Sequence, residues 1–174
     1  TIRDPEHAAL SGARAGLHGE LERLEAFVPV GRIQNAGVWA AHLQVLDTEL
    51  TRGRVDVAAR VWRDAYGAAL ESRGWEGMIA VGDAFTRIGH AGGTPGGARM
   101  NARDAYLIAL IRARRTGSVD GALRSAAAFR EPGGGLIVEQ CLHIAAQLAA
   151  GDDQAQESVR QARHRWAPSP IAGS

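Results

Sequence analysis

Apolar residues recur at spacings of three and four along almost the whole chain, and this pattern constrains the fold more than any other feature. Such spacing places apolar side chains on one face of an α-helix, whereas a β-strand needs alternation. The only β-like run, Val28-Pro29-Val30, is too short to form a useful strand. Glycine or proline interrupts the helical pattern at intervals, as is typical where one helix ends and the next begins. The sequence therefore predicts an all-α protein.

The glycines and prolines that interrupt the helical pattern predict about eight helices joined by short connections. They are expected at residues 5–27, 36–51, 55–72, 75–88, 98–115, 119–130, 136–150 and 153–166. Short connections indicate that sequential helices pack as antiparallel hairpins. We expect one helical-repeat domain over residues 1–167, with an N-terminal helix within 1–30, paired helices over 36–166 and a flexible tail at 168–174.

Small side chains dominate the composition, with 33 alanines and 22 glycines against only nine aromatic residues. The core therefore has few bulky rings to fill the space between helices. We expect thin helix interfaces in which alanine and glycine allow the backbones to approach closely.

The chain contains no lysine, because all 20 of its basic residues are arginine. This absence excludes Schiff-base catalysis, the phosphate loop that ends in Gly-Lys-Ser/Thr, and Ser-Lys hydrolase chemistry. The formal net charge of +1 argues against a protein that coats nucleic acid or an anionic membrane. We therefore expect no nucleic-acid or membrane partner. Because the sequence also shows no catalytic constellation, we expect a protein that is not an enzyme.

The number of cysteines and the hydropathy of the chain indicate the cellular compartment in which the protein is expected. Cys141 is the single cysteine, so no internal disulfide can form, and it is expected to be a small buried hydrophobe. No stretch approaches the ~18 to 20 apolar residues that cross a bilayer. We expect a cytoplasmic protein, and the arginine-only, alanine-rich usage is typical of GC-rich bacterial genomes.

The spacing of His and Glu, as in Glu139 and His143, does not match a di-iron motif, so no metal or cofactor is expected.

Two internal similarities suggest a repeat. Residues 63–70 match residues 103–110 at six of eight positions, an offset of 40, and residues 53–58 resemble 117–122 at an offset of 64. The two offsets place the fifth helix differently, as the second or the first member of a hairpin. Both are compatible with two helices per unit, which is typical of an α-solenoid.

Two segments resemble the tetratricopeptide family. Residues 78–89 resemble that family's first helix, with Gly82 where a neighbouring helix approaches and Phe85 three residues later. Gly53, followed by Ala58, Trp62 and Ala65, resembles the second helix. The resemblance covers about residues 36–166 and implies a superhelix of helix hairpins. A single irregular helical bundle is the alternative.

The resemblance implies a groove, lined by the first helices, that binds a partner peptide or helix. The family's carboxylate clamp is not carried over, because lysine is absent and the comparable positions are Leu43 and Leu107. The candidate groove residues are Leu43, Asp47, Met78, Leu107, Ile111, Arg114 and Arg115. This mixed lining suits a protein or peptide ligand, and the function it implies is that of a scaffold or interaction module.

Alternatives remain open at this point. The bundle could bind or sense a small molecule, with access at the glycine-rich segment 90–97, which we expect to be a loop. The basic run Arg112, Arg114 and Arg115 is expected to complement a helix dipole. Self-association through the terminal helices is a further expectation, because an array leaves apolar surface at its ends.

Overall fold

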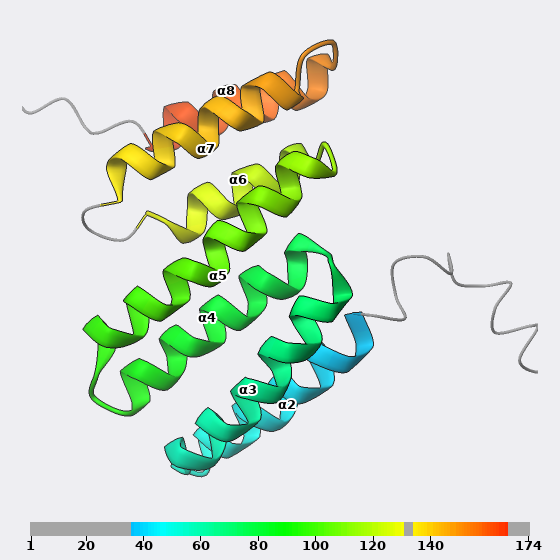
Figure 1. Cartoon of the computed structure of the whole chain (residues 1–174). Coiled ribbons are helices and arrows are strands. Elements are labelled where there is room, and N and C mark those ends of the chain that lie inside the picture. The colour runs from blue at the N-terminus through cyan, green and yellow to red at the C-terminus, as the bar shows by residue number, and fades with distance from the viewer. Residues whose placement is uncertain (1–35, 131–133, 167–174) are drawn as a thin grey trace, which may run out of the picture.

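The computed structural model describes residues 36–130 and 134–166, and every regular element in this part of the chain is an α-helix (Figure 1). The helices are α2 (Ala36–Thr51), α3 (Val55–Ser72), α4 (Trp75–Ala91), α5 (Pro95–Arg115), α6 (Val119–Ala128), α7 (Gly135–Leu148) and α8 (Asp153–Trp166). The predicted all-α class is confirmed for these residues. The helix expected at 5–27 and the tail expected at 168–174 lie outside the described residues.

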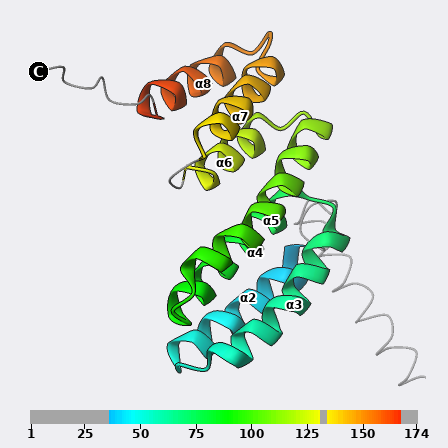
Figure 2. The ribbon, with the colours of Figure 1, turned by 60° about the vertical axis from the view of Figure 1, so that its left-hand side comes forward.

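The helices stack in chain order, with α2 and α3 at one end and α7 and α8 at the other (Figures 1 and 2). Within the described residues, every contact between helices joins elements that are one or two apart along the chain. The most extensive contacts are those within the hairpins α2–α3, α4–α5 and α6–α7. Each described helix therefore packs only against helices near it in the stack.

The second helix of each hairpin begins after a constant interval. Helices α3, α5 and α7 start at Val55, Pro95 and Gly135, so successive starts lie 40 residues apart. The sequence similarity at an offset of 40 relates α3 to α5, in agreement with this interval. The fifth expected helix, α5, therefore makes its largest interface as the second member of the α4–α5 hairpin.

The similarity at an offset of 64 has a local cause. Gly53, Gly93 and Gly117 each follow the end of a helix with φ between +69° and +73°. Each donates its amide to the carbonyl three residues back, and the next residue donates to the carbonyl five back, as Thr94 does to Gly89 at 2.8 Å. This is the Schellman arrangement, which favours glycine because the backbone is left-handed. Gly53 and Gly117 thus share a helix-ending motif without marking equivalent hairpins.

The prediction of a loop at residues 90–97 is wrong. Helix α4 continues to Ala91 and α5 begins at Pro95, so three residues connect them. Proline is favoured in the first turn of a helix, where its missing N–H is not needed, and Gly93 is the helix-ending residue of α4. Gly96 and Gly97 lie inside α5. The cluster of glycines therefore spans the end of one helix and the start of the next. The remaining expected helix ends agree with the structure to within two residues.

Small residues bring the helices close together, as predicted. Half of the buried apolar side chains in the described residues are alanine. A Cβ atom at Gly82 would overlap the ring of Tyr106, and one at Gly121 would lie 2.7 Å from the Cβ of Ala113. These glycines let α4 approach α5 and α6 approach α5 more closely than any other residue would allow.

Arg112 of α5 binds backbone oxygens that lie far from it in the sequence. Its guanidinium donates to the backbone oxygens of Ala69, Leu70 and Gly74 at 2.8 to 2.9 Å, where α3 ends. Carbonyl groups at a helix C-terminus lack partners within the helix, and this arginine satisfies two of them, on Ala69 and Leu70, together with the carbonyl of Gly74 in the connection to α4. Burial lowers the pKa of Arg112, and neighbouring Arg115 lowers it further. Arg112 therefore caps α3, a neighbour in space, in addition to lying in the last turn of its own helix.

Candidate functional site

An open pocket of about 430 Å³ lies where α6 stops short of its neighbours. Helix α6 has 10 residues, whereas α4 has 17 and α5 has 21. Because α6 ends at Ala128, the end of the hairpin at which α4 joins α5 extends beyond it (Figure 1). We call this hollow the α6-end pocket. Its chemically distinctive lining residues are Asp83, Arg87, Arg99, Met100, Arg103, Tyr106 and Phe129.

The floor of the α6-end pocket is built from side chains that hold one another. The hydroxyl of Tyr106 donates to Oδ1 of Asp83 at 2.8 Å, which ties α5 to α4. The edge of the Tyr106 ring meets the Phe129 ring at 5.6 Å between centroids. The guanidinium of Arg103 lies 5.7 Å from the centroid of Phe129, within the range of a cation–π contact. Residues from α4, α5 and the end of α6 thus form one preorganised surface.

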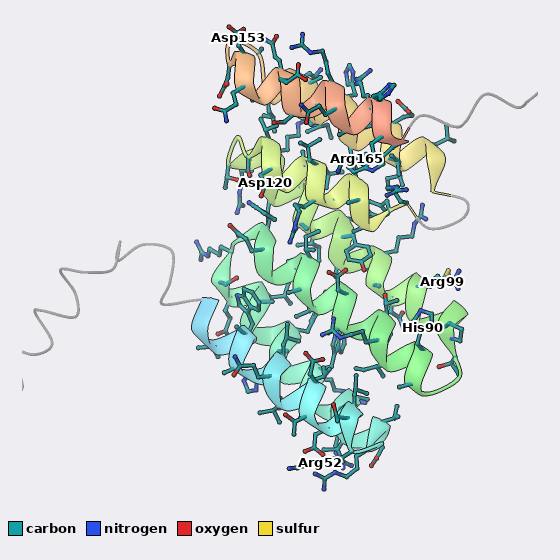
Figure 3. The ribbon with its side chains drawn as sticks, turned by 180° about the vertical axis from the view of Figure 1, so that it is seen from behind. Arg52, His90, Arg99, Asp120, Asp153 and Arg165 are labelled. Carbon is teal, nitrogen blue, oxygen red and sulfur yellow. The ribbon has the colours of Figure 1, made fainter. Side chains whose placement is uncertain are left out.

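Positive charge exceeds negative charge around this pocket. Its lining carries three guanidinium groups, from Arg87, Arg99 and Arg103, and one carboxylate, from Asp83. Arg87 also holds Oδ1 of Asp47 at 3.0 and 3.1 Å through two of its nitrogens. Arg99 lies near the connection between α4 and α5, at the side of the stack where His90 also lies (Figure 3). Planar guanidinium groups suit carboxylate and phosphate ligands, so the pocket favours an anion.

An apolar element accompanies this charge. The side chain of Met100 is 74% exposed at the rim, beside the largely buried rings of Tyr106 and Phe129. Methionine adapts its shape to different apolar partners because it is unbranched and flexible. The pocket can therefore bind a group that is anionic on one side and apolar on the other.

Asp47 and Asp83, two carboxylates that an acid–base site could use, each bind a residue of another helix. An enzyme would need distant residues such as His42, Asp47, Asp83 and His90 to converge. Asp47 instead binds Arg87, and Asp83 binds Tyr106. Among the same residues, no three His, Cys, Asp or Glu side chains gather as metal ligands would.

Cys141 lies buried on α7, as predicted. Burial raises the pKa of its thiol to about 11, so the thiol is protonated at neutral pH. A thiolate is the form that acts as nucleophile or metal ligand, so this side chain belongs to the core. Nearby His143 is exposed, with its Nε2 at 3.0 Å from Nε2 of Gln147.

The predicted groove residues are divided between the core and the surface. Leu43 and Met78 are buried in the core, so they have almost no surface to offer a partner. Leu107 is half-buried, and Asp47 is exposed in its ion pair with Arg87. Ile111, which is 66% exposed, lies with exposed Arg114 and Arg115 toward the end of α5. None of the seven lines the α6-end pocket.

Sequence reasoning missed the residues that do form the pocket, although it had noticed two signals. Arg103 and Tyr106 belong to the segment repeated at an offset of 40, which we interpreted only as evidence of a repeat. Arg99 follows the glycine-rich segment 90–97, which we interpreted only as a loop that could give a small molecule access to the bundle. No local pattern indicated that Phe129 would meet Tyr106.

No family model, no curated protein and no solved structure matches this chain. The tetratricopeptide-like resemblance therefore stays a prediction. Among the helices within the described residues, none combines the length and apolarity needed to span a bilayer.

Proposed function

We propose that this protein is a non-catalytic interaction module that holds an acidic segment of a partner protein in the α6-end pocket. The observation that carries the proposal is the group of three arginines around the Tyr106–Phe129 floor. Anchoring residues at protein interfaces are often arginine and aromatic residues in preformed hollows. The linked contacts of Asp83, Tyr106, Phe129 and Arg103 hold this surface in place before a partner arrives.

The chemistry of the pocket defines the kind of segment it would accept. Arg99 and Arg103 would pair with a carboxylate of the partner, and Met100 with Phe129 would contact an apolar side chain next to it. The partner motif is therefore an acidic residue adjacent to an aliphatic or aromatic one. A tetratricopeptide-like array is part of this proposal, because stacked hairpins present extended surfaces to peptides. The 40-residue interval between hairpins is longer than the 34 residues typical of that family.

The test is affinity purification from the native host with mass spectrometry, using matched pairs of variants. Met100→Asp is compared with Asn101→Asp, which adds the same charge one residue away, outside the pocket lining. Arg103→Glu is compared with Arg114→Glu on the same helix. All four residues are exposed, so thermal unfolding should change little.

The expected result is a partner that is retained by wild type, Asn101→Asp and Arg114→Glu and lost from Met100→Asp and Arg103→Glu. A partner that is retained by both pocket variants would refute the assignment. A partner lost on Arg114→Glu alone would instead favour the groove that was predicted from the sequence, which includes Arg114.

A second candidate function is the binding of a small anionic molecule in the same pocket. The volume of about 430 Å³ favours it, because ligand pockets commonly measure roughly 300–1,000 Å³. We would titrate aromatic monocarboxylates and dicarboxylates and follow the melting temperature. A rise for wild type that is absent in Arg103→Glu is expected if such a ligand is native, and an unchanged wild type rejects this candidate.

A further inference from the structure

A second hollow surface runs between α6 and α8, and it shares only Ala127 with the lining of the α6-end pocket. One hollow of about 280 Å³ is lined by residues near the starts of both helices, and another of about 320 Å³ by residues near their ends. Leu123 and Ser158 line both hollows, so the two are continuous. We call this surface the α6–α8 groove.

Apolar side chains at helical spacing run along the α6–α8 groove, beside polar residues of α8 such as Ser158 and Gln161. Val119, Leu123 and Ala127 follow one another at intervals of four along α6. Ala155 and Ala162 contribute from α8. Side chains at intervals of four form a ridge on a helix surface, and two such ridges leave a channel into which the ridge of a third helix can pack.

The two ends of the groove carry opposite charges. Asp120 and Asp152 line the end where α6 and α8 begin, Arg124 lies one turn further along α6, and Arg165 lines the end where α8 finishes. Figure 3 shows the same separation, with Asp120 at one end of these helices and Arg165 at the opposite end. The groove therefore discriminates between the two directions in which a charged helix could lie.

A docked helix has one favourable orientation in this field. Helices commonly carry acidic residues in the first turn and basic residues in the last, where they complement the helix dipole. Lying antiparallel to α6, such a helix places its acidic turn beside Arg165 and its basic turn beside Asp120 and Asp152. Lying parallel, it would place like charges together. Since α6 has 10 residues, the groove accommodates about three turns.

A second copy of this chain is a poorer occupant than a different protein. Helix α8 has the required order of charges, with Asp153 in its first turn and Arg163 and Arg165 in its last. However, its buried residues, Val159 and Ala162, already face its own neighbours. Ala155 and Trp166 also pack against the core, and the remaining residues of α8 are polar, so the helix has no apolar stripe left for the floor of another copy's groove.

We propose that the α6–α8 groove docks an amphipathic helix of a partner protein, acidic in its first turn and basic in its last, lying antiparallel to α6. This surface is independent of the α6-end pocket, apart from Ala127, which borders both. It would give the protein a second site for a partner whose recognition depends on the direction of a helix.

A display library of helical peptides tests the proposal. All members share one apolar stripe; half are acidic first and basic last, and half have the reverse order. We expect wild type to enrich the first half. Affinities of enriched peptides, measured by fluorescence anisotropy, should fall about tenfold for Arg165→Glu and for Asp120→Arg, as expected when an attractive charge contact becomes repulsive. The matched controls Arg163→Glu and Asp153→Arg alter similar turns but do not line the groove, and should change affinity less than about twofold.

The double variant Asp120→Arg with Arg165→Glu makes the test specific, because it should prefer the reversed peptides. Circular dichroism establishes that each variant is folded, and Arg165→Gln replaces Arg165→Glu if the latter is not. No enrichment of either half, equal binding of both, or equal losses in the controls would overturn the proposal. Dimerisation of wild type that Arg165→Glu abolishes would show that a second copy occupies the groove, which also overturns it.

Discussion

Two glycines on α4 determine how closely it packs against α5. Gly82 faces the ring of Tyr106, and Gly89, seven residues later, faces the methyl group of Ala98. A Cβ atom at either glycine would overlap these groups. Tyr106 is also the residue that binds Asp83 in the α6-end pocket. The packing of this interface and the geometry of the pocket therefore depend on the same contact.

Substituting two mid-helix glycines should have opposite effects. Gly82→Ala forces the Tyr106 ring to move, and overpacking of this kind lowers the free energy of unfolding by about 1–3 kcal/mol. Gly67→Ala on α3 has nothing within 4 Å of the new methyl group. It should raise the free energy of unfolding by about 0.5–1 kcal/mol, because alanine is the better helix former. Urea denaturation measures both, and a Gly82→Ala protein as stable as wild type would contradict the close contact.

Single residues also show why the site was harder to predict than the fold. Spacing along the chain indicated that Met78 lies on an apolar face, but not whether that face is covered. The structure buries Met78 completely and leaves Met100 exposed. Burial depends on which helix packs over a face, and no local pattern contains that information.

At the scale of elements, the length of α5 explains the pocket. Helices α5 and α7 start 40 residues apart, and α5 takes 21 residues of this interval. Only a short α6 fits in the remainder, so it ends before it can cover the α4–α5 end of its neighbours. The pocket is thus a consequence of an uneven division of the hairpin interval.

The connection between α4 and α5 can be tested with two alanine substitutions. Gly93 has φ +70°, which an L-residue tolerates poorly, so Gly93→Ala should lower the free energy of unfolding by about 1 kcal/mol. Gly96 lies in the first turn of α5 with open space around it. Gly96→Ala should raise the free energy by up to about 1 kcal/mol. Thermal and urea unfolding would measure these changes. Equal small effects at both positions would instead fit the long loop expected from the sequence.

At the scale of the whole molecule, the two ends of the stack differ. The exposed side of α8 is polar. Helix α2 leaves Val38 and Val45 about half exposed on its surface. Apolar surface at one end keeps the expectation of self-association open, with α2 as the described helix best suited to it.

Because helices contact only near neighbours in the chain, a substitution that destabilises one end of the stack should leave the other end folded. Val159→Asp introduces a charge at a buried position of α8, which should unfold α8 and weaken α6 and α7. Amide hydrogen exchange measured helix by helix should leave α2 and α3 protected. Val81→Asp in α4 is the central control and should reduce protection throughout. Equal loss in all helices for Val159→Asp would favour a single cooperative bundle over an array.

The sequence by itself determined those properties that depend on short stretches of backbone. The apolar spacing predicted the helices, and glycine marked the ends of α2 and α5, because helical periodicity and left-handed φ angles are local properties. Only the tertiary structure decided which groups meet across the chain. Arg112 reaches the end of α3 over 43 residues, and Arg87 reaches Asp47 over 40. The pocket and the groove depend on contacts of that kind, since charge and shape become a site only when packing brings separate helices together.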